Sequence, residues 1–154
     1  MRNLILALAG AAALAVPAVA PAFASDTADV MAAVKQYDAA FNNSDMKAWN
    51  ALCADQTIII DDFAPHVWQG ASACGDWWNA LDAADKKAGD SDLKVTLEKP
   101  WRVKVTGDAA YVVEPSVVAF KEKGKALTEH GVWTLALRKQ SAGWRIAGWS
   151  WAQR

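Results

Sequence analysis

The chain has 154 residues, and its 16 basic and 17 acidic side chains give a formal net charge of −1. This balance gives no electrostatic reason to bind nucleic acid or an anionic membrane surface. The two cysteines, Cys53 and Cys74, are too few for a disulfide scaffold or a zinc cage. Either one disulfide bridge or two buried thiols would suit them.

The first 24 residues have the pattern of an export signal. Arg2 precedes an apolar run over 4–16, and Ala22-Phe23-Ala24 forms an A-x-A cleavage site. A membrane anchor is the alternative, because residues 4–24 carry no charge. The small residues, two prolines and the cleavage triplet favour removal. We therefore predict a signal peptide over 1–24 and one domain over 25–154, periplasmic or secreted and free of the membrane after cleavage.

Helical periodicity dominates the start of the predicted mature chain. Val30, Val34, Tyr37 and Phe41 are spaced by three or four residues, which predicts a first helix over 27–42. A short second helix is expected over 44–53, capped by Ser44. A strand over 57–62 follows, and then a third helix that runs from after Gly70 to residue 88 and ends at Gly89.

From residue 93 onward the apolar period changes to two. This pattern predicts strands over 93–97, 101–105, 110–121, 126–139 and 144–151. Pro115 predicts a bulge or a sheet edge, and Gly131 and Gly148 predict bulges or sharp bends. Helices followed by a run of antiparallel strands are typical of the α+β class. We expect three N-terminal helices packed on a strongly bent, mostly antiparallel sheet that forms a cone around a pocket.

Nine tryptophans in a domain of this size predict an aromatic pocket as well as an aromatic core. Trp149 and Trp151 are expected on one face of the last strand, and Trp144 and Ile146 on the other. One of these faces would pack under the helices. The other would meet the cavity or a second copy of the chain, which favours a homodimer.

Two segments read YDAAFNNSD over 37–45 and ALCAD over 51–55, and they are followed by Asp61 and Gly70. These residues resemble the NTF2-like superfamily, specifically its SnoaL-like and ketosteroid-isomerase-like branch. Steroid isomerases of the family have a similar Tyr-x-Ala-Ala-Leu-Asn-x-Gly-Asp and Ala-Leu-Phe-Ala-Asp. The resemblance covers essentially the whole mature chain and supports the cone-shaped fold. It implies that Tyr37 corresponds to the oxyanion-hole tyrosine and Asp61 to the proton-shuttling aspartate.

The family's second oxyanion donor, an aspartate on a late strand, has no equivalent in this chain. Trp133 stands near that position, with His130 close by. Glu114, beside Pro115, could supply a second carboxyl with a raised pKa if its strand faces the pocket. The alternative for Glu114 is an ordinary place on the sheet surface.

As a general base, Asp61 would take a proton next to a carbonyl or a leaving group, with a pKa raised by a partly dry pocket. The alternative is that Asp61 and Asp62 only cap the strand. The candidate catalytic residues are Asp61, Tyr37, His130 and Glu114. The candidate ligand contacts are Trp68, Trp133, Trp149 and His66, the last of these at the cavity mouth.

The two histidines and Asp61 could form the two-histidine, one-carboxylate set that binds non-haem iron. Nothing in their spacing selects it, so neither a metal nor a cofactor is expected. We expect a small apolar or amphipathic molecule in the pocket. The sequence leaves three functions open: a cofactor-free lyase or isomerase, a ligand-binding protein without catalysis, and a dimeric structural module.

Overall fold

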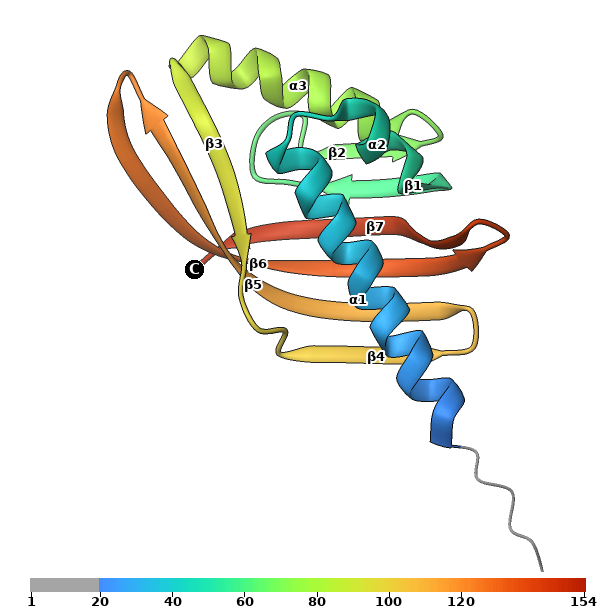
Figure 1. Ribbon diagram of the computed structural model, residues 1–154. Helices are drawn as coiled ribbons and strands as arrows, with labels where there is room; N and C mark the ends of the chain where they lie inside the picture. Colours follow the sequence, from blue (N-terminus) through green and yellow to red (C-terminus); the bar gives the residue numbers. More distant parts are fainter. Residues whose placement is uncertain (1–19) are drawn as a thin grey trace, which may run out of the picture.

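Three helices and a seven-stranded sheet make up the described chain, residues 20–154 of a computed structural model, with side chains described from Asp26 onward (Figure 1). The helices are α1 (Ala20–Asn42), α2 (Met46–Ala51) and α3 (Ala73–Ala88). The strands are β1 (Cys53–Ile60), β2 (Val67–Gly70), β3 (Asp90–Leu97), β4 (Arg102–Thr106), β5 (Ala109–Glu122), β6 (Lys125–Gln140) and β7 (Gly143–Gln153). The predicted α+β class is confirmed.

The helix predictions are confirmed in kind and corrected in detail. The N-cap of α2 is Asp45 and not Ser44, because the Asp45 carboxylate accepts the backbone N–H of Ala48 at 2.9 Å. Gly89 ends α3 in the left-handed conformation, with φ 86°, as a glycine at a helix C-terminus commonly does. Cys53, expected on the second helix, begins β1 instead, and the short strand β2 was not predicted.

The sheet is mixed at one place only within residues 20–154. Its order is β2-β1-β7-β6-β5-β3, with β4 also paired to β5, and every pairing is antiparallel except that of β1 with β7. β5 and β6 form a long hairpin whose far end bends away beside β3 and stands opposite α3 (Figure 1). The sheet is therefore strongly curled, and α1 crosses its concave face (Figure 1).

Pro115 shows how β5 serves two partners. β4 pairs with β5 up to Val113, and β3 pairs with it from Ser116 onward, so Pro115 lies where the partner changes. Its missing N–H costs little at such a place. Of the two predicted alternatives at Pro115, the bulge is not found, because Pro115 pairs with Val132 of β6 without a register shift. The edge alternative suits its place between the pairings with β4 and β3.

A bulge in β7 changes which residues face inward. Gly148 pairs with Ala136 and Ile146 with Leu137, so Ala147 is an extra residue between two regular stretches. An extra residue reverses the alternation of faces beyond it. The prediction that Trp144 and Ile146 face opposite to Trp149 and Trp151 is therefore wrong. Trp144, Ile146 and Trp149 are all buried, and Trp151 lines the same inner face.

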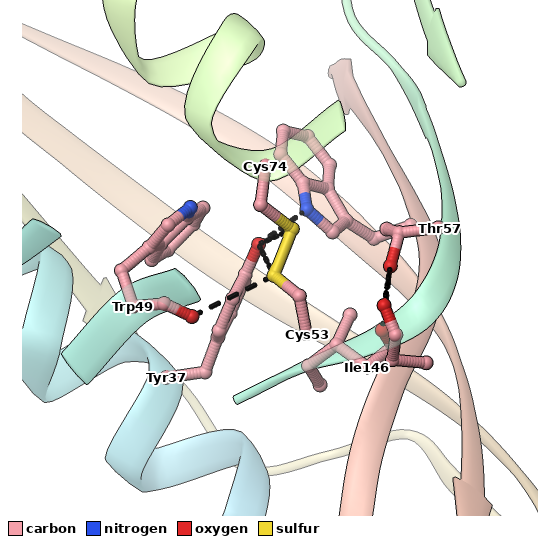
Figure 2. Close-up of a disulfide and its surroundings, with 8 residues drawn as sticks. Tyr37, Trp49, Cys53, Thr57, Cys74 and Ile146 are labelled. Atoms are coloured by element: carbon pink, nitrogen blue, oxygen red, sulfur yellow. Dashed lines mark hydrogen bonds between the residues drawn. A yellow bond between two sulfur atoms is a disulfide. The ribbon is translucent and has the colours of Figure 1, made fainter. Parts of the chain in front are cut away.

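The core under α1 is aromatic and is closed by a disulfide. Tyr37 stacks on Trp49 with ring centroids 3.5 Å apart, and both side chains are fully buried. Cys53 and Cys74 are bonded to each other, with their Cα atoms 6.7 Å apart, which decides between the two states left open by the sequence (Figure 2). The bridge joins the start of β1 to the first turn of α3.

The predicted signal peptide extends over 1–24, and residues 1–19 lie outside the described part of the chain. None of the helices over residues 20–154 combines the length and the apolar character that a membrane crossing requires.

Candidate functional site

A cavity of about 290 Å³ lies between α3, β3 and the bent end of the β5–β6 hairpin, and it is partly open to solvent. Its walls combine aromatic rings with carboxylates. The aromatic lining includes Phe41, Phe63, Trp77, Trp133, Trp149 and Trp151. The volume is near the lower end of the range of about 300–1,000 Å³ that is common for ligand pockets.

Asp61 lies in the cavity wall, directly after β1. Strand alternation puts it on the same face as Ile59, which is fully buried beneath it. The indole N–H of Trp77 donates to Asp61 Oδ2 at 2.9 Å, and the backbone N–H of Asp62 donates to Oδ1 at 2.9 Å. Burial raises the pKa of Asp61 from 3.8 to about 6. The two hydrogen bonds oppose this rise, and the charge of Asp62 adds to it.

The loop after Asp61 is held by contacts between its ends. The backbone N–H of Asp61 donates to the carbonyl of His66 at 3.1 Å, and His66 Nδ1 lies 3.2 Å from the carbonyl oxygen of Asp61. His66 is exposed and does not line the cavity. Trp68 is buried behind the lining, with its ring 5.0 Å from that of Phe63. Both residues, expected as ligand contacts, instead support the loop that carries Asp61.

Tyr37 is fully buried and does not line the cavity. Its hydroxyl accepts the indole N–H of Trp149 at 2.9 Å and lies 3.8 and 3.9 Å from the sulfurs of Cys74 and Cys53 (Figure 2). Complete burial raises the pKa of Tyr37 well above its ordinary value. Since Tyr37 is absent from the lining, it holds Trp149 in place from behind. Of the expected tyrosine and aspartate, only Asp61 is part of the cavity lining.

Glu114 is on the inner face of β5 but outside the cavity. Its side chain is only 2% exposed, so the alternative of a sheet-surface glutamate is wrong. Burial raises its pKa from 4.5 to about 7, and the nearby charge of Asp38 adds to this, while Lys35 opposes it. Trp133, its register partner on β6, lines the cavity and separates Glu114 from it.

His130 lies on the other side of the sheet. Gly131 and Trp133 are buried on the inner face of β6, and strand alternation turns His130 outward, where it is exposed. A role for His130 at the cavity is therefore excluded by the direction of its strand face. No set of three or more His, Cys, Asp or Glu side chains among the described residues is arranged to hold a metal ion.

Four further carboxylates line the cavity: Asp62, Asp85, Asp90 and Glu129. Burial raises the pKa of Asp85 from 3.8 to about 6, with additional effects from the charges of Asp90 and Asp82. It also raises the pKa of Glu129, with smaller effects from Asp62 and Asp90. Their sequence signals are weak but present. Asp85 continues the helix stripe of Trp77 and Leu81, and Glu129 shares the strand period of Gly131 and Trp133.

The chain belongs to the SnoaL-like domain family, whose profile matches residues 30–151. The resemblance to the SnoaL-like and ketosteroid-isomerase-like branch of the NTF2-like superfamily is thus confirmed. Among curated proteins no match was found.

Solved structures share the fold at low sequence identity. A ketosteroid isomerase-like protein of Erwinia carotovora atroseptica is 20% identical with a TM-score of 0.67, and the match covers 83% of this chain and 95% of that one. An NTF2-like superfamily protein of Salmonella enterica is 17% identical with a TM-score of 0.72, over 86% and 93% of the two chains. The CaMKII hub of S. rosetta is 22% identical with a TM-score of 0.68, over 90% and 100%. At these identities the likeness establishes the fold alone.

Proposed function

We propose that this protein binds a small amphipathic molecule in the cavity and that Asp61 transfers a proton to and from it. One observation carries the proposal: a carboxylate in an aromatic cavity wall has a pKa of about 6, close to the pH at which it would work. A group with such a pKa can accept a proton and return it without a large energetic penalty in either direction.

The chemistry follows from the placing of the Asp61 oxygens. One is held by the Trp77 indole and the other by the Asp62 backbone, so the carboxylate is fixed in orientation. It would take a proton from a carbon next to a carbonyl or a leaving group. Return of the proton to a different atom gives an isomerisation. In an elimination, the electron pair of the broken C–H bond forms a new carbon–carbon double bond, and the leaving group departs with the electron pair of its own bond to carbon.

Binding without turnover is the second candidate, and the position of Tyr37 favours it. A developing oxyanion needs donors aimed at it. The Tyr37 hydroxyl instead contacts Trp149 and the disulfide, outside the cavity lining. In this case Asp61 would orient a ligand and transfer no proton. A purely structural role is disfavoured, because the tryptophans line the cavity and do not fill it.

The substitution Asp61→Asn tests the proposal, with Asp55→Asn as a matched control. Asp55 is an exposed residue of β1 outside the cavity. Burial raises the pKa of folded Asp61, so ionisation destabilises the fold progressively as the pH rises towards and through 6. Above pH 6 the Asn variant should be more stable than wild type by about 1 kcal/mol, less than the full shift because the cavity is partly open.

Turnover and binding of small carbonyl and hydroxy compounds are measured on the same proteins. Loss of turnover with binding retained supports proton transfer by Asp61. Binding by wild type with no turnover of any compound supports the second candidate. Unchanged turnover and binding in Asp61→Asn would refute a role for this carboxylate.

We also propose export and self-association, each from separate observations. The A-x-A triplet at 22–24 and the disulfide both suit a periplasmic or secreted protein. Ile58, Ile60 and Val67 are 43%, 48% and 49% exposed on the outer face of the sheet, which supports a homodimer through that face. N-terminal sequencing should find Ser25, and light scattering should find a dimer that Ile60→Glu converts to a monomer.

A further inference from the structure

We infer that the ligand of this cavity carries a positive charge, as an amphipathic amine or a quaternary ammonium compound. The inference rests on the proposed small-molecule function and specifies the chemical class of the ligand. It is carried by the combination of acids and aromatic rings in one cavity wall, and by the absence of basic side chains among the described lining residues.

The acids of the cavity converge from four separate parts of the fold. Asp61 and Asp62 follow β1, Asp85 is on α3, Asp90 begins β3, and Glu129 is on β6. No lysine, arginine or histidine is among the described lining residues. Negative charge is therefore concentrated on all sides of one space of about 290 Å³.

The chain does not neutralise these acids elsewhere. The ion pairs found over residues 26–154 use the carboxylates of Asp26, Asp82, Asp92 and Glu98, and none of these lines the cavity. Lys86, which follows Asp85 directly in the sequence, pairs with Asp82 and not with a cavity acid. A positive charge at the centre of the acids would have to come from the ligand.

Most of the indole N–H groups in the cavity lining are already engaged in hydrogen bonds with the protein. Three of the four lining indoles donate to protein groups: Trp77 to Asp61, Trp149 to Tyr37, and Trp151 to Ser116. An anionic ligand would need free donors, and these three are already used. The electron-rich face of a tryptophan ring instead attracts a cation, most strongly where water is excluded.

Of an anionic, a neutral and a cationic ligand, the cationic one interacts most favourably with the cavity acids. An anion would be repelled by the carboxylates. A neutral apolar ligand would displace water from them and increase the desolvation that already raises the pKa of Asp61, Asp85 and Glu129. A cation would offset both the desolvation and the mutual repulsion of the acids, and it would also contact the aromatic faces.

The test uses ligands of matched shape and different charge. Phenyltrimethylammonium is the cation, tert-butylbenzene its neutral isostere, and benzenesulfonate, also a phenyl ring with one tetrahedral head, the anion. Binding is measured at pH 7.5 through tryptophan fluorescence and calorimetry. We expect the cation to bind at least tenfold more tightly than the neutral isostere, and the anion not to bind. The affinity for the cation should fall as salt is added. It should also fall as the pH is lowered from 7.5 to 5, because Asp61 and Asp85, whose pKa burial raises to about 6, become protonated.

Charge-removing variants distinguish the effect of the cavity acids on binding from the effect of the overall charge of the protein. Asp85→Asn and Glu129→Gln should each weaken binding of the cation at least threefold and should not weaken binding of the neutral isostere. Asp55→Asn removes the same charge from an exposed site outside the cavity and should change neither.

The outcomes distinguish this inference from the function on which it rests. If the neutral compound or the anion binds as tightly as the cation, or if Asp85→Asn and Glu129→Gln do not weaken binding of the cation, the inference is overturned and the small-molecule function stands. Binding of none of the three compounds overturns both.

Discussion

Two acids on the same inner face, the half-buried Asp61 and the buried Glu114, differ in how their surroundings stabilise the charge. Burial is the main cause of a raised pKa in both. Asp61 has two N–H donors and a cavity beside it, whereas Glu114 is 2% exposed and its Oε2 has no hydrogen-bond partner among the described residues. The same desolvation therefore produces an accessible acid–base group at one site and a cost in stability at the other.

The difference extends to the regions around the two acids. The core under α1 holds Glu114, Tyr37 and the disulfide with hardly any exposed surface. The region under α3 holds Asp61 in a space that a ligand can enter. We expect changes in the first region to act on stability, and changes at the cavity to act on ligands.

The largest effect is expected from removal of the disulfide. Replacing Cys53 and Cys74 together by serine frees a loop with a sequence separation of 21. The chain-entropy estimate for a loop of this length is about 3 kcal/mol of lost stability. Urea unfolding of the double variant measures it, with reduced wild type as the control. A loss below about 1 kcal/mol would contradict the expected role of the bridge.

Glu114→Gln should stabilise the protein in a pH-dependent way. The pKa of folded Glu114 is raised from 4.5 to about 7, so ionisation has no effect below about pH 4 and destabilises the fold increasingly as the pH rises through 7. The full shift corresponds to about 3 kcal/mol, and glutamine recovers about 2 kcal/mol because its amide N–H₂ also needs a partner.

Unfolding curves at pH 4 and pH 8 check this expectation. The gain should be present at pH 8 and absent at pH 4. Glu122→Gln, an exposed change on the same strand, is the control and should have no effect at either pH. The charges of Asp38 and Lys35 also act on Glu114. A gain in stability that is equal at both pH values would show that packing, and not the charge of Glu114, is responsible.

Gly131→Ala should have the smallest effect on stability, and its effect should reach the cavity. A Cβ atom at Gly131 would lie 2.3 Å from Cε2 of Trp151, so the indole that lines the cavity must move. We expect a loss of about 1 kcal/mol, a shift in tryptophan emission and weaker ligand binding. Gly75→Ala, where the nearest contact is an ordinary 3.7 Å, should leave emission and binding unchanged. An unaltered emission spectrum in Gly131→Ala would contradict the expected movement.

Local sequence patterns were sufficient to predict most helices and strands. They were not sufficient to predict how distant segments pair. The stripe from Val30 to Phe41 and the alternation from Leu93 onward each reflect neighbours in the chain. The parallel contact of β1 with β7 and the extra residue Ala147 depend on distant partners. The strand β2 has four residues and follows a loop, which leaves too short a pattern to recognise.

The candidate site was predicted where one strand determines it and missed where several elements meet. Asp61 ends an apolar strand, so its position in the wall follows from local alternation. Asp85, Asp90 and Glu129 come together only in the folded chain. Tyr37 was correctly expected to point inward, but the direction of its hydroxyl is decided by Trp149 and the disulfide, which are far from it in sequence.

The bridge between Cys53 and Cys74 also makes residues 53–74 a covalently closed ring that contains Asp61 and its loop. A protease that cuts this exposed loop between Asp62 and His66 would yield two polypeptides that remain joined through sulfur. Such a nicked protein would run as one species without reductant and as two fragments with it. The cavity acid would stay tethered to the rest of the molecule after the cut.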